Sequence, residues 1–174
     1  MVDGVGALLQ PLLSWRAAGV WSDNRESNIL DGSAPYYTTY RCADGRFVAV
    51  AALERRFYTE LLEGLALNRA DLPDRAEAAQ HAALREILEQ RFAEKTRDEW
   101  AAVFAGTDAC VTPVLAAGEA PSHPQIKARG TLRERDGVVE AAPAPRFSRS
   151  QPPVAGPARI VGFDEVARGW RGGS

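Results

Sequence analysis

An Asp-Gly pair between two strand-like segments restricts the fold of this chain more than any other sequence feature. Residues 36–41 are aromatic and β-branched, and residues 46–51 are mostly apolar. Asp44-Gly45 lies between them and is typical of a tight turn, because glycine accepts the backbone conformation that such turns need. The sequence therefore predicts an antiparallel β-hairpin over residues 36–51.

Helical and strand patterns follow this hairpin along the chain. We expect helices over about 54–67 and 77–93, because apolar residues recur there at helical spacing. Residues 96–99 read Thr-Arg-Asp-Glu, which predicts a capping box that opens a third helix extending through Phe104. A short buried strand over 109–115 and a second hairpin over 131–141 complete the pattern. These elements predict an α+β fold.

The two ends of the chain differ from this middle part. Residues 1–18 predict a helix with an exposed apolar face, which Pro11 should kink or interrupt. Residues 19–35 predict a loop, and residues from 142 onward, rich in Pro, Arg, Ser and Gly, predict an extended tail. We therefore expect three parts, at 1–35, 36–141 and 142–174, and we expect the ends to need a partner or an oligomer.

Composition excludes several classes of function. The chain is 45% hydrophobic and 25% charged, which allows a core, and its 21 basic and 23 acidic residues form no basic block. We therefore expect no nucleic-acid partner. Apolar stretches are too short to span a membrane, and the start lacks the basic segment of a secretory signal. Cys42 and Cys110 are expected to be free thiols, and a cytoplasmic location is expected.

Few residues offer chemistry on their own. His81 is expected on a helix surface and His123 in a loop, while Cys110 is interpreted as a small buried residue. Glu54 ends an apolar strand and begins a helix. A carboxylate is stabilised there simply because a helix N-terminus favours negative charge. The same position could also hold a carboxylate rigidly at the mouth of a cleft.

Four sequence blocks carry a resemblance to a known family. They are Asn28 to Tyr37 continuing to Val50, Leu53-Glu54 with Phe57-Tyr58, Thr96 to Trp100 with Gly106 to Val114, and His123-Pro124 with Arg129-Gly130 and Pro143 to Ser148. These blocks resemble the α-methylacyl-CoA racemases of the class III CoA-transferase superfamily (CaiB/BaiF type), in the family's order and over residues 1 to about 150. Ala51 and Ser33 depart from the family, which usually has glycine there, and Arg55-Arg56 stand where Pro-Gln is frequent.

The resemblance implies the small domain of the class III CoA-transferase fold, made of hairpins and helices, with flanking segments of an incomplete large domain. It implies interconversion of the R and S forms of 2-methylacyl-CoA thioesters by removal of the α-proton through an enolate. The acyl-CoA thioester is the substrate, and no cofactor or metal is expected. By its place in the motif, Glu54 corresponds to a carboxylate that supports the catalytic histidine. Because the loop before the hairpin contributes to the family's acyl pocket, Leu30 and Tyr37 are expected to contact the acyl chain, and a role as ordinary core residues is the open alternative.

The resemblance also implies that the principal catalytic pair lies elsewhere. The family's catalytic His and Asp and its CoA-binding region precede the part that matches this chain. We therefore expect the chain alone to be inactive, and to act as a homo-oligomer or with a second chain that supplies that half. Two alternatives stay open. One is a class III CoA-transferase that acts on carboxylic acids, and the other is a non-catalytic interaction module or inert truncated remnant.

Overall fold

The structure is a computed structural model that describes residues 1–150, 156 and 160–171. The chain divides into two compact units, Met1–Val114 and Leu115–Ser174. Each is described by itself below. The sequence predicts three parts, with borders after residues 35 and 141. Those borders stay a prediction.

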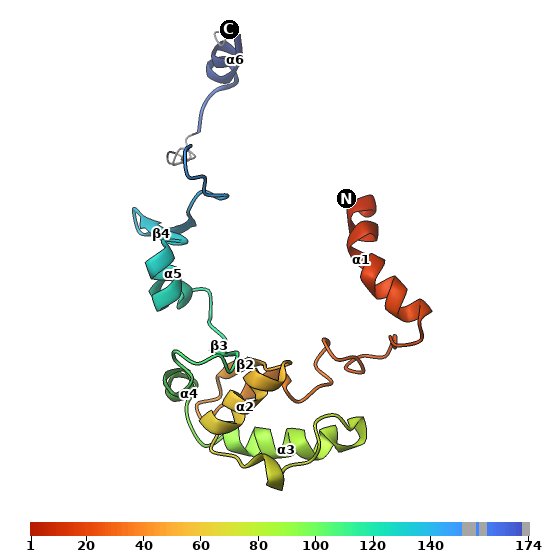
Figure 1. Cartoon of the computed structure of the whole chain (residues 1–174). Coiled ribbons are helices and arrows are strands. Elements are labelled where there is room, and N and C mark those ends of the chain that lie inside the picture. The colour runs from red at the N-terminus through yellow and green to blue at the C-terminus, as the bar shows by residue number, and fades with distance from the viewer. Residues whose placement is uncertain (151–155, 157–159, 172–174) are drawn as a thin grey trace. The chain divides into compact units, whose positions relative to one another are not determined.

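The first unit is built on a three-stranded antiparallel sheet in the order β1-β2-β3 (Figure 1). Strands β1 (Tyr37–Arg41) and β2 (Phe47–Ala51) form the predicted hairpin, and β3 (Val111–Pro113) pairs with the other side of β2. Gly45 has a φ of +77° in the turn, a left-handed value that glycine adopts without strain. The hairpin prediction is confirmed.

Three helices cover one face of this sheet. They are α2 (Arg55–Gly64), α3 (His81–Phe92) and α4 (Arg97–Val103). The short 3-10 turns η1 (Arg69–Asp71) and η2 (Ala78–Gln80) connect α2 to α3. The capping box predicted at the start of α4 is present, since Thr96 and Glu99 each bind the other's backbone N–H.

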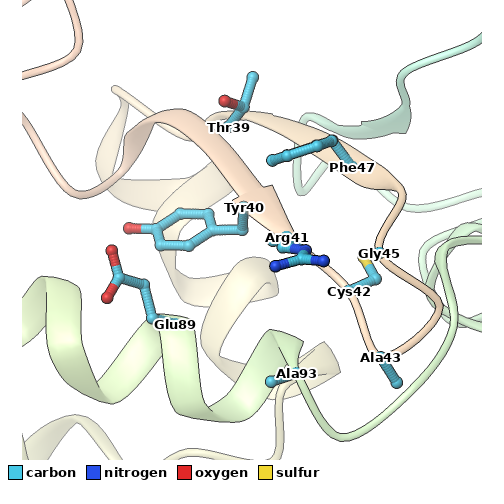
Figure 2. A pocket seen from close by; sticks show the side chains of 9 residues that line it. All are labelled: Thr39, Tyr40, Arg41, Cys42, Ala43, Gly45, Phe47, Glu89 and Ala93. Carbon is cyan, nitrogen blue, oxygen red and sulfur yellow. The ribbon is translucent and has the colours of Figure 1, made fainter.

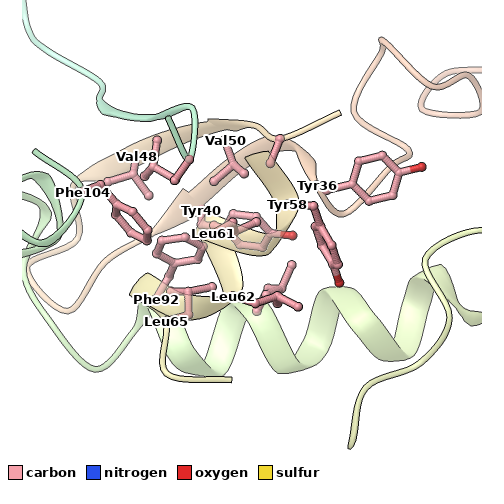
Figure 3. Close-up of a cluster of buried hydrophobic side chains, with 14 of the residues drawn as sticks. Tyr36, Tyr40, Val48, Val50, Tyr58, Leu61, Leu62, Leu65, Phe92 and Phe104 are labelled. Carbon is pink, nitrogen blue, oxygen red and sulfur yellow. The ribbon is translucent and has the colours of Figure 1, made fainter. Parts of the chain in front are cut away.

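The core of this unit lies between the sheet and the helices (Figure 3). An aromatic group forms its centre, in which the Phe92 ring stacks on Tyr40 at 4.9 Å and meets Trp100 edge-on at 5.4 Å. The buried Trp100 side chain donates its indole N–H to the Phe92 carbonyl at 2.9 Å. Leucines of α2 and α3 fill the remaining space: Leu61, Leu62, Leu65, Leu84 and Leu88. Burial of each such side chain is worth about 1.5–3 kcal/mol.

Helix α2 ends earlier than expected, at Gly64, and this glycine also makes a close contact. Ala66 takes a left-handed φ of +53°, which ends the helical path. Gly64 itself lies against Phe104, and a Cβ placed there would be 2.3 Å from the Phe104 Cε1 atom. The close approach of Phe104 therefore requires glycine at this position.

Helix α1 (Val2–Ala17) begins the chain and continues without a break through Pro11. None of its residues is buried, and Val5, Leu8 and Leu13 are among its exposed apolar side chains. The predicted apolar face is confirmed, whereas an interruption at Pro11 is not. One missing donor is tolerated where the rest of the helix keeps its hydrogen bonds.

The second unit contains short elements. After the 3-10 turn η3 (Ala120–Ser122) and α5 (Pro124–Arg129), β4 (Leu132–Arg135) and β5 (Val138–Ala141) form an antiparallel hairpin. Its turn is at Asp136 and Gly137, with φ values of +50° and +78°, as the sequence predicts. The α+β fold class is thus confirmed across both units.

Helix α6 (Phe163–Arg171) corrects the prediction of an extended tail from residue 142. The Pro-rich composition that suggested extension stops at Pro157. After it, Phe163 and Val166 are three residues apart, which is helical spacing. Residues 151–155, 157–159 and 172–174 of the expected tail lie outside the described residues.

Candidate functional site

Glu54 lies at the junction between β2 and α2, as expected from its sequence context. It is the N-cap residue of α2, with extended backbone angles of −74° and 150°, and its side chain makes no capping hydrogen bond. The side chain is exposed. Within the described residues no hydrogen bond or ion pair engages its carboxylate, so the carboxylate is available to a group from outside this unit.

Leu30 and Tyr37 lie together at a hollow on the sheet face opposite the core. The hollow has a volume of about 350 Å³. The hairpin register places Tyr37 opposite Ala51 and Thr39 opposite Ala49, so small side chains form its floor. Glu54 is three residues beyond Ala51 in the chain, but it does not line the hollow. The full lining is Leu30, Gly32, Tyr37, Thr38, Thr39, Ala49, Val50 and Ala51.

The loop that carries Leu30 is held by a partly buried polar network. The Asn28 side chain donates to an Asp31 carboxylate oxygen at 2.8 Å, and the Ser33 hydroxyl donates to the Asn28 carbonyl at 2.7 Å. Desolvation acts to raise the pKa of Asp31, but hydrogen bonds from Asn28, Ser27 and Ser33 outweigh it and lower that pKa below its usual value. Ser33, which departs from the family pattern, thus takes part in closing the loop.

Arg85 joins this loop to the helical layer. From α3, its guanidinium donates to the Gly32 carbonyl at 2.5 Å and to the Ser33 carbonyl at 3.0 Å. One side chain therefore fixes two consecutive peptide groups beside the hollow. Sequence patterns gave no signal for this role, because it depends on a contact between residues more than fifty positions apart.

Cys110 lies near Glu54 and corrects the interpretation of a buried strand residue. It precedes β3, has a left-handed φ of +54°, and is only partly buried. Its carbonyl accepts the Ala51 N–H at 3.0 Å. Burial raises the pKa of the Cys110 thiol, and the carboxylates of Glu54 and Asp108 raise it further. A thiol in this setting is a poor nucleophile.

The Arg56 charge next to Glu54 is engaged by other groups. The Arg56 guanidinium approaches the Asp108 carboxylate at 3.9 Å and lies over the Phe57 ring at 4.4 Å. The Glu60 carboxylate accepts the Asp108 N–H at 2.6 Å. These contacts tie the segment before β3 to α2 on the same side of the unit as Glu54.

His81 is not a surface residue, contrary to the prediction from the helix pattern. It is half-buried, its ring meets Tyr36 edge-on at 5.9 Å, and its Nε2–H donates to the Arg75 carbonyl at 2.9 Å. His123 lies at the N-cap position of α5 in the second unit without a side-chain capping hydrogen bond, in the connection where the sequence predicted it. Neither histidine hydrogen-bonds to Glu54 among the described contacts.

A larger hollow of about 550 Å³ lies along the edge of β1 (Figure 2). Arg41 and Cys42 line it from the hairpin, and Glu89 of α3 and Ala93, the residue that follows α3, line it from the other side. Burial is the main reason that the pKa of the Cys42 thiol is raised. None of the site residues predicted from the sequence lines this hollow. It shares only Thr39 with the lining of the Leu30–Tyr37 hollow.

Two kinds of feature are absent from the described residues. No group of three or more His, Cys, Asp and Glu side chains is placed there to hold a metal ion. No helix in the described part of the chain combines the length and apolar character needed to cross a bilayer.

Comparison with known proteins places these features in a family. The sequence model of the family described as "CoA-transferase family III" matches residues 1–164 of this chain. The α-methylacyl-CoA racemase of Mus musculus is 42% identical over 151 residues, and that of Homo sapiens is 43% identical over 148 residues. These matches cover 86% and 83% of this chain. A CaiB/baiF CoA-transferase family protein of Caenorhabditis elegans is 38% identical over 118 residues, which is 68% of this chain.

Solved structures agree on the fold. A crystal structure of Rv3272 from Mycobacterium tuberculosis superimposes with a TM-score of 0.59 at 13% identity, and covers 83% of this chain and 38% of that one. A mutant of the same protein gives a TM-score of 0.60 at 15% identity, over 88% of this chain and 43% of the other. The chain spans about 40% of the mouse racemase, 38% of the human one and 33% of the worm protein. It belongs to CoA-transferase family III.

Proposed function

We propose that this chain forms the carboxy-terminal part of a 2-methylacyl-CoA racemase and that Glu54 is its contribution to the proton-transfer machinery. One observation carries the proposal. Glu54 is the N-cap of α2 and follows β2, whose residues Ala49 and Ala51 floor the Leu30–Tyr37 hollow, by three positions, and its carboxylate has no hydrogen-bond or ion-pair partner among the described residues. The similarity to the mouse and human racemases supports the same assignment.

The reaction needs a base and an acid on opposite faces of the substrate. The proton on the carbon next to a thioester carbonyl is only weakly acidic, so the enzyme must remove it, stabilise the enolate oxygen, and return a proton to the other face. A histidine that takes this proton becomes an imidazolium. A carboxylate that accepts its second N–H fixes the ring tautomer and stabilises the positive charge. We assign this supporting role to Glu54.

The hollow beside β1 and β2 suits the acyl chain. Its floor consists of small side chains of the hairpin, and Leu30 and Tyr37 form its walls. An apolar acyl chain gains about 25 cal/mol for each Å² removed from water, so even a shallow hollow contributes to binding. We propose that Leu30 and Tyr37 contact the acyl part of the thioester.

The proton-shuttling His and Asp are proposed to come from the part of the family that this chain does not cover. That part could be supplied by a second polypeptide or by a second copy of a longer chain. The exposed apolar side chains of α1 support a partner, because Val5, Leu8 and Leu13 have no cover within their own unit.

Deuterium exchange in a chimera tests the proposal. This chain would replace the matching segment of the mouse racemase, and α-proton exchange of a 2-methylacyl-CoA would be followed by NMR in D₂O. We expect exchange in the chimera and none with the chain alone. Glu54→Gln should lower kcat about 10–100-fold. Glu63→Gln, on the exposed side of the same helix, is the matched control and should retain the activity.

Two results would contradict the assignment. Robust exchange by the chain alone would place the base within residues 1–174. An active chimera that loses nothing on Glu54→Gln would remove Glu54 from the machinery.

CoA transfer between carboxylic acids is the second candidate, because the matching family and the worm relative both carry the transferase name. That reaction uses an aspartate of the uncovered part as a nucleophile, which forms an acyl anhydride with release of CoA thiolate. Incubation of the chimera with an acyl-CoA and a carboxylate acceptor distinguishes the two candidates, since only a transferase produces the acceptor's CoA thioester. A chimera active in neither assay would favour a non-catalytic interaction module.

A further inference from the structure

Arg75 lies in the connection between α2 and α3 and reaches back to the end of β2. Its guanidinium donates to the Ala52 carbonyl at 3.2 Å and to the Leu53 carbonyl at 2.6 Å. These are the two peptide groups that immediately precede Glu54. Because a guanidinium presents its N–H groups in a rigid planar fork, one side chain can fix both carbonyls at once.

Two aromatic rings hold the Arg75 guanidinium in place. Its central carbon lies 4.5 Å from the centre of the Tyr36 ring and 4.6 Å from that of Tyr58. Tyr36 precedes β1 and Tyr58 belongs to α2, and both are buried. Each cation–π contact is worth about 0.5–2 kcal/mol. The two rings therefore hold the Arg75 guanidinium at the junction between the sheet and α2.

The backbone of Arg75 is fixed as well. The His81 Nε2–H donates to the Arg75 carbonyl at 2.9 Å, and the Gln80 side chain accepts the Asp74 N–H at 2.7 Å. His81 in turn packs edge-on against Tyr36. The start of α3 therefore supports the loop from which Arg75 extends.

The segment that Arg75 holds turns sharply before Glu54. The Leu53 N–H donates to the Ala51 carbonyl at 3.0 Å, two residues back, while the Ala52 N–H donates to the Tyr36 carbonyl at 2.9 Å. Immediately afterwards the Glu54 carbonyl accepts the first helical bond, from Tyr58. The direction in which the Glu54 side chain leaves the backbone depends on this turn, and its carbonyl groups need donors from elsewhere.

We infer that Arg75 is a positioning residue, which fixes the turn at residues 52–53 so that the Glu54 carboxylate points to the imidazole that it supports. This inference rests on the function proposed above for Glu54. Arg75 touches neither substrate nor reacting atoms, and it acts only through the backbone that carries Glu54.

Arg91 provides a matched control within the same molecule. It donates to the Leu65 carbonyl at 2.6 Å and to the Ala66 carbonyl at 3.2 Å, so it holds two consecutive peptide groups at the other end of α2. Loss of either side chain removes two hydrogen bonds to backbone carbonyls, and loss of Arg91 also removes its ion pair with Glu94. Only the fork of Arg75 is next to Glu54.

The first test uses the full 174-residue chain and amide hydrogen exchange followed by NMR. Arg75→Met should speed exchange of the Leu53 amide about 10-fold and leave the Leu65 amide unchanged. Arg91→Met should do the reverse. Equal exchange of the Leu53 amide in the wild type and in Arg75→Met would overturn the inference.

The second test measures α-proton exchange in the mouse-racemase chimera. Arg75→Met should lower kcat about 10–100-fold and change KM less than about 3-fold, because binding of the acyl chain is not affected. Arg75→Lys keeps the charge and the aliphatic stem, so it should fold, but it should have the same low kcat because an ammonium lacks the planar fork. Equal kcat losses in Arg75→Met and Arg91→Met, or full activity of Arg75→Lys, would overturn the inference.

The two tests separate this inference from the proposed function. An inactive parent chimera would count against the function of Glu54, while the exchange of the Leu53 amide would still show whether Arg75 fixes the turn. An active parent chimera with an unaffected Arg75→Met variant would count against Arg75 alone.

Discussion

The two faces of the three-stranded sheet use the same hairpin for different purposes. The inner face carries Tyr40, Val48 and Val50, which are at most 3% exposed and pack against the helices. The outer face carries Tyr37, Thr39 and Ala49 and forms the hollow beside Leu30. The comparison shows that the two-residue alternation of the strands directs the main core side chains to one face and the small side chains of the hollow's floor to the other, although Val50 and Tyr37 take part in both regions.

The largest expected effect is on the inner side. Phe92→Ala removes the fully buried ring that packs against Tyr40, Trp100 and Phe104, and we expect it to lower the free energy of unfolding by about 3–5 kcal/mol. Urea unfolding of the full chain followed by circular dichroism would measure the change. A loss below about 1 kcal/mol would show that the inner layer does not hold the unit together.

A smaller effect is expected where α2 meets α4. Gly64→Ala would place a Cβ against the Phe104 ring, and the crowding should cost about 1–3 kcal/mol of stability. Gly106→Ala is a useful comparison, because a Cβ there meets no atom within 4 Å, although its φ of +77° adds backbone strain. The same urea measurement applies. No loss in Gly64→Ala would mean that Phe104 moves freely.

Acid should loosen the outer side before the core. Because the pKa of Asp31 is lowered in the folded chain, its stabilising effect is complete above its ordinary value of 3.8 and is lost as the pH falls below that value. The loop around Leu30 should then open, which NMR would detect as faster exchange of the Asn28 amide. In Asp31→Asn this dependence on pH should disappear. If the Asn28 amide of the wild type shows no such acid dependence, the carboxylate is not what holds the loop.

The smallest effect is expected from the matching substitution on the outer face. Phe47 is 43% exposed and lies opposite Arg41, so Phe47→Ala should cost about 1 kcal/mol or less. Comparison of its urea midpoint with that of Phe92→Ala measures how much more the inner face contributes to stability than the outer face. Similar losses in the two variants would contradict the separation of roles.

Local signals in the sequence were enough to predict much of this unit. Asp44-Gly45 specified the hairpin turn, and the pair Thr96 and Glu99 specified the start of α4. Both signals are contained within a few residues, so their physics does not depend on the rest of the fold. The resemblance to a family added Glu54, Leu30 and Tyr37, of which the last two line one hollow.

Contacts between distant segments could not be predicted in this way. His81 was assigned to the surface because a helical pattern does not show that Tyr36 lies beside it. Arg75 gave no signal, since its role depends on carbonyls more than twenty residues earlier. Helix α6 was missed because the Pro-rich composition before it was extended to the end of the chain.

The recurrent use of arginine as a two-carbonyl fork affects which mutations this protein can accept. Arg75, Arg85 and Arg91 each satisfy a pair of adjacent peptide oxygens. Lysine, usually the mildest exchange for arginine, offers a single ammonium and cannot reproduce that geometry. In a deep mutational scan these three positions should therefore reject lysine as strongly as neutral residues, whereas the solvent-exposed Arg25 should tolerate both.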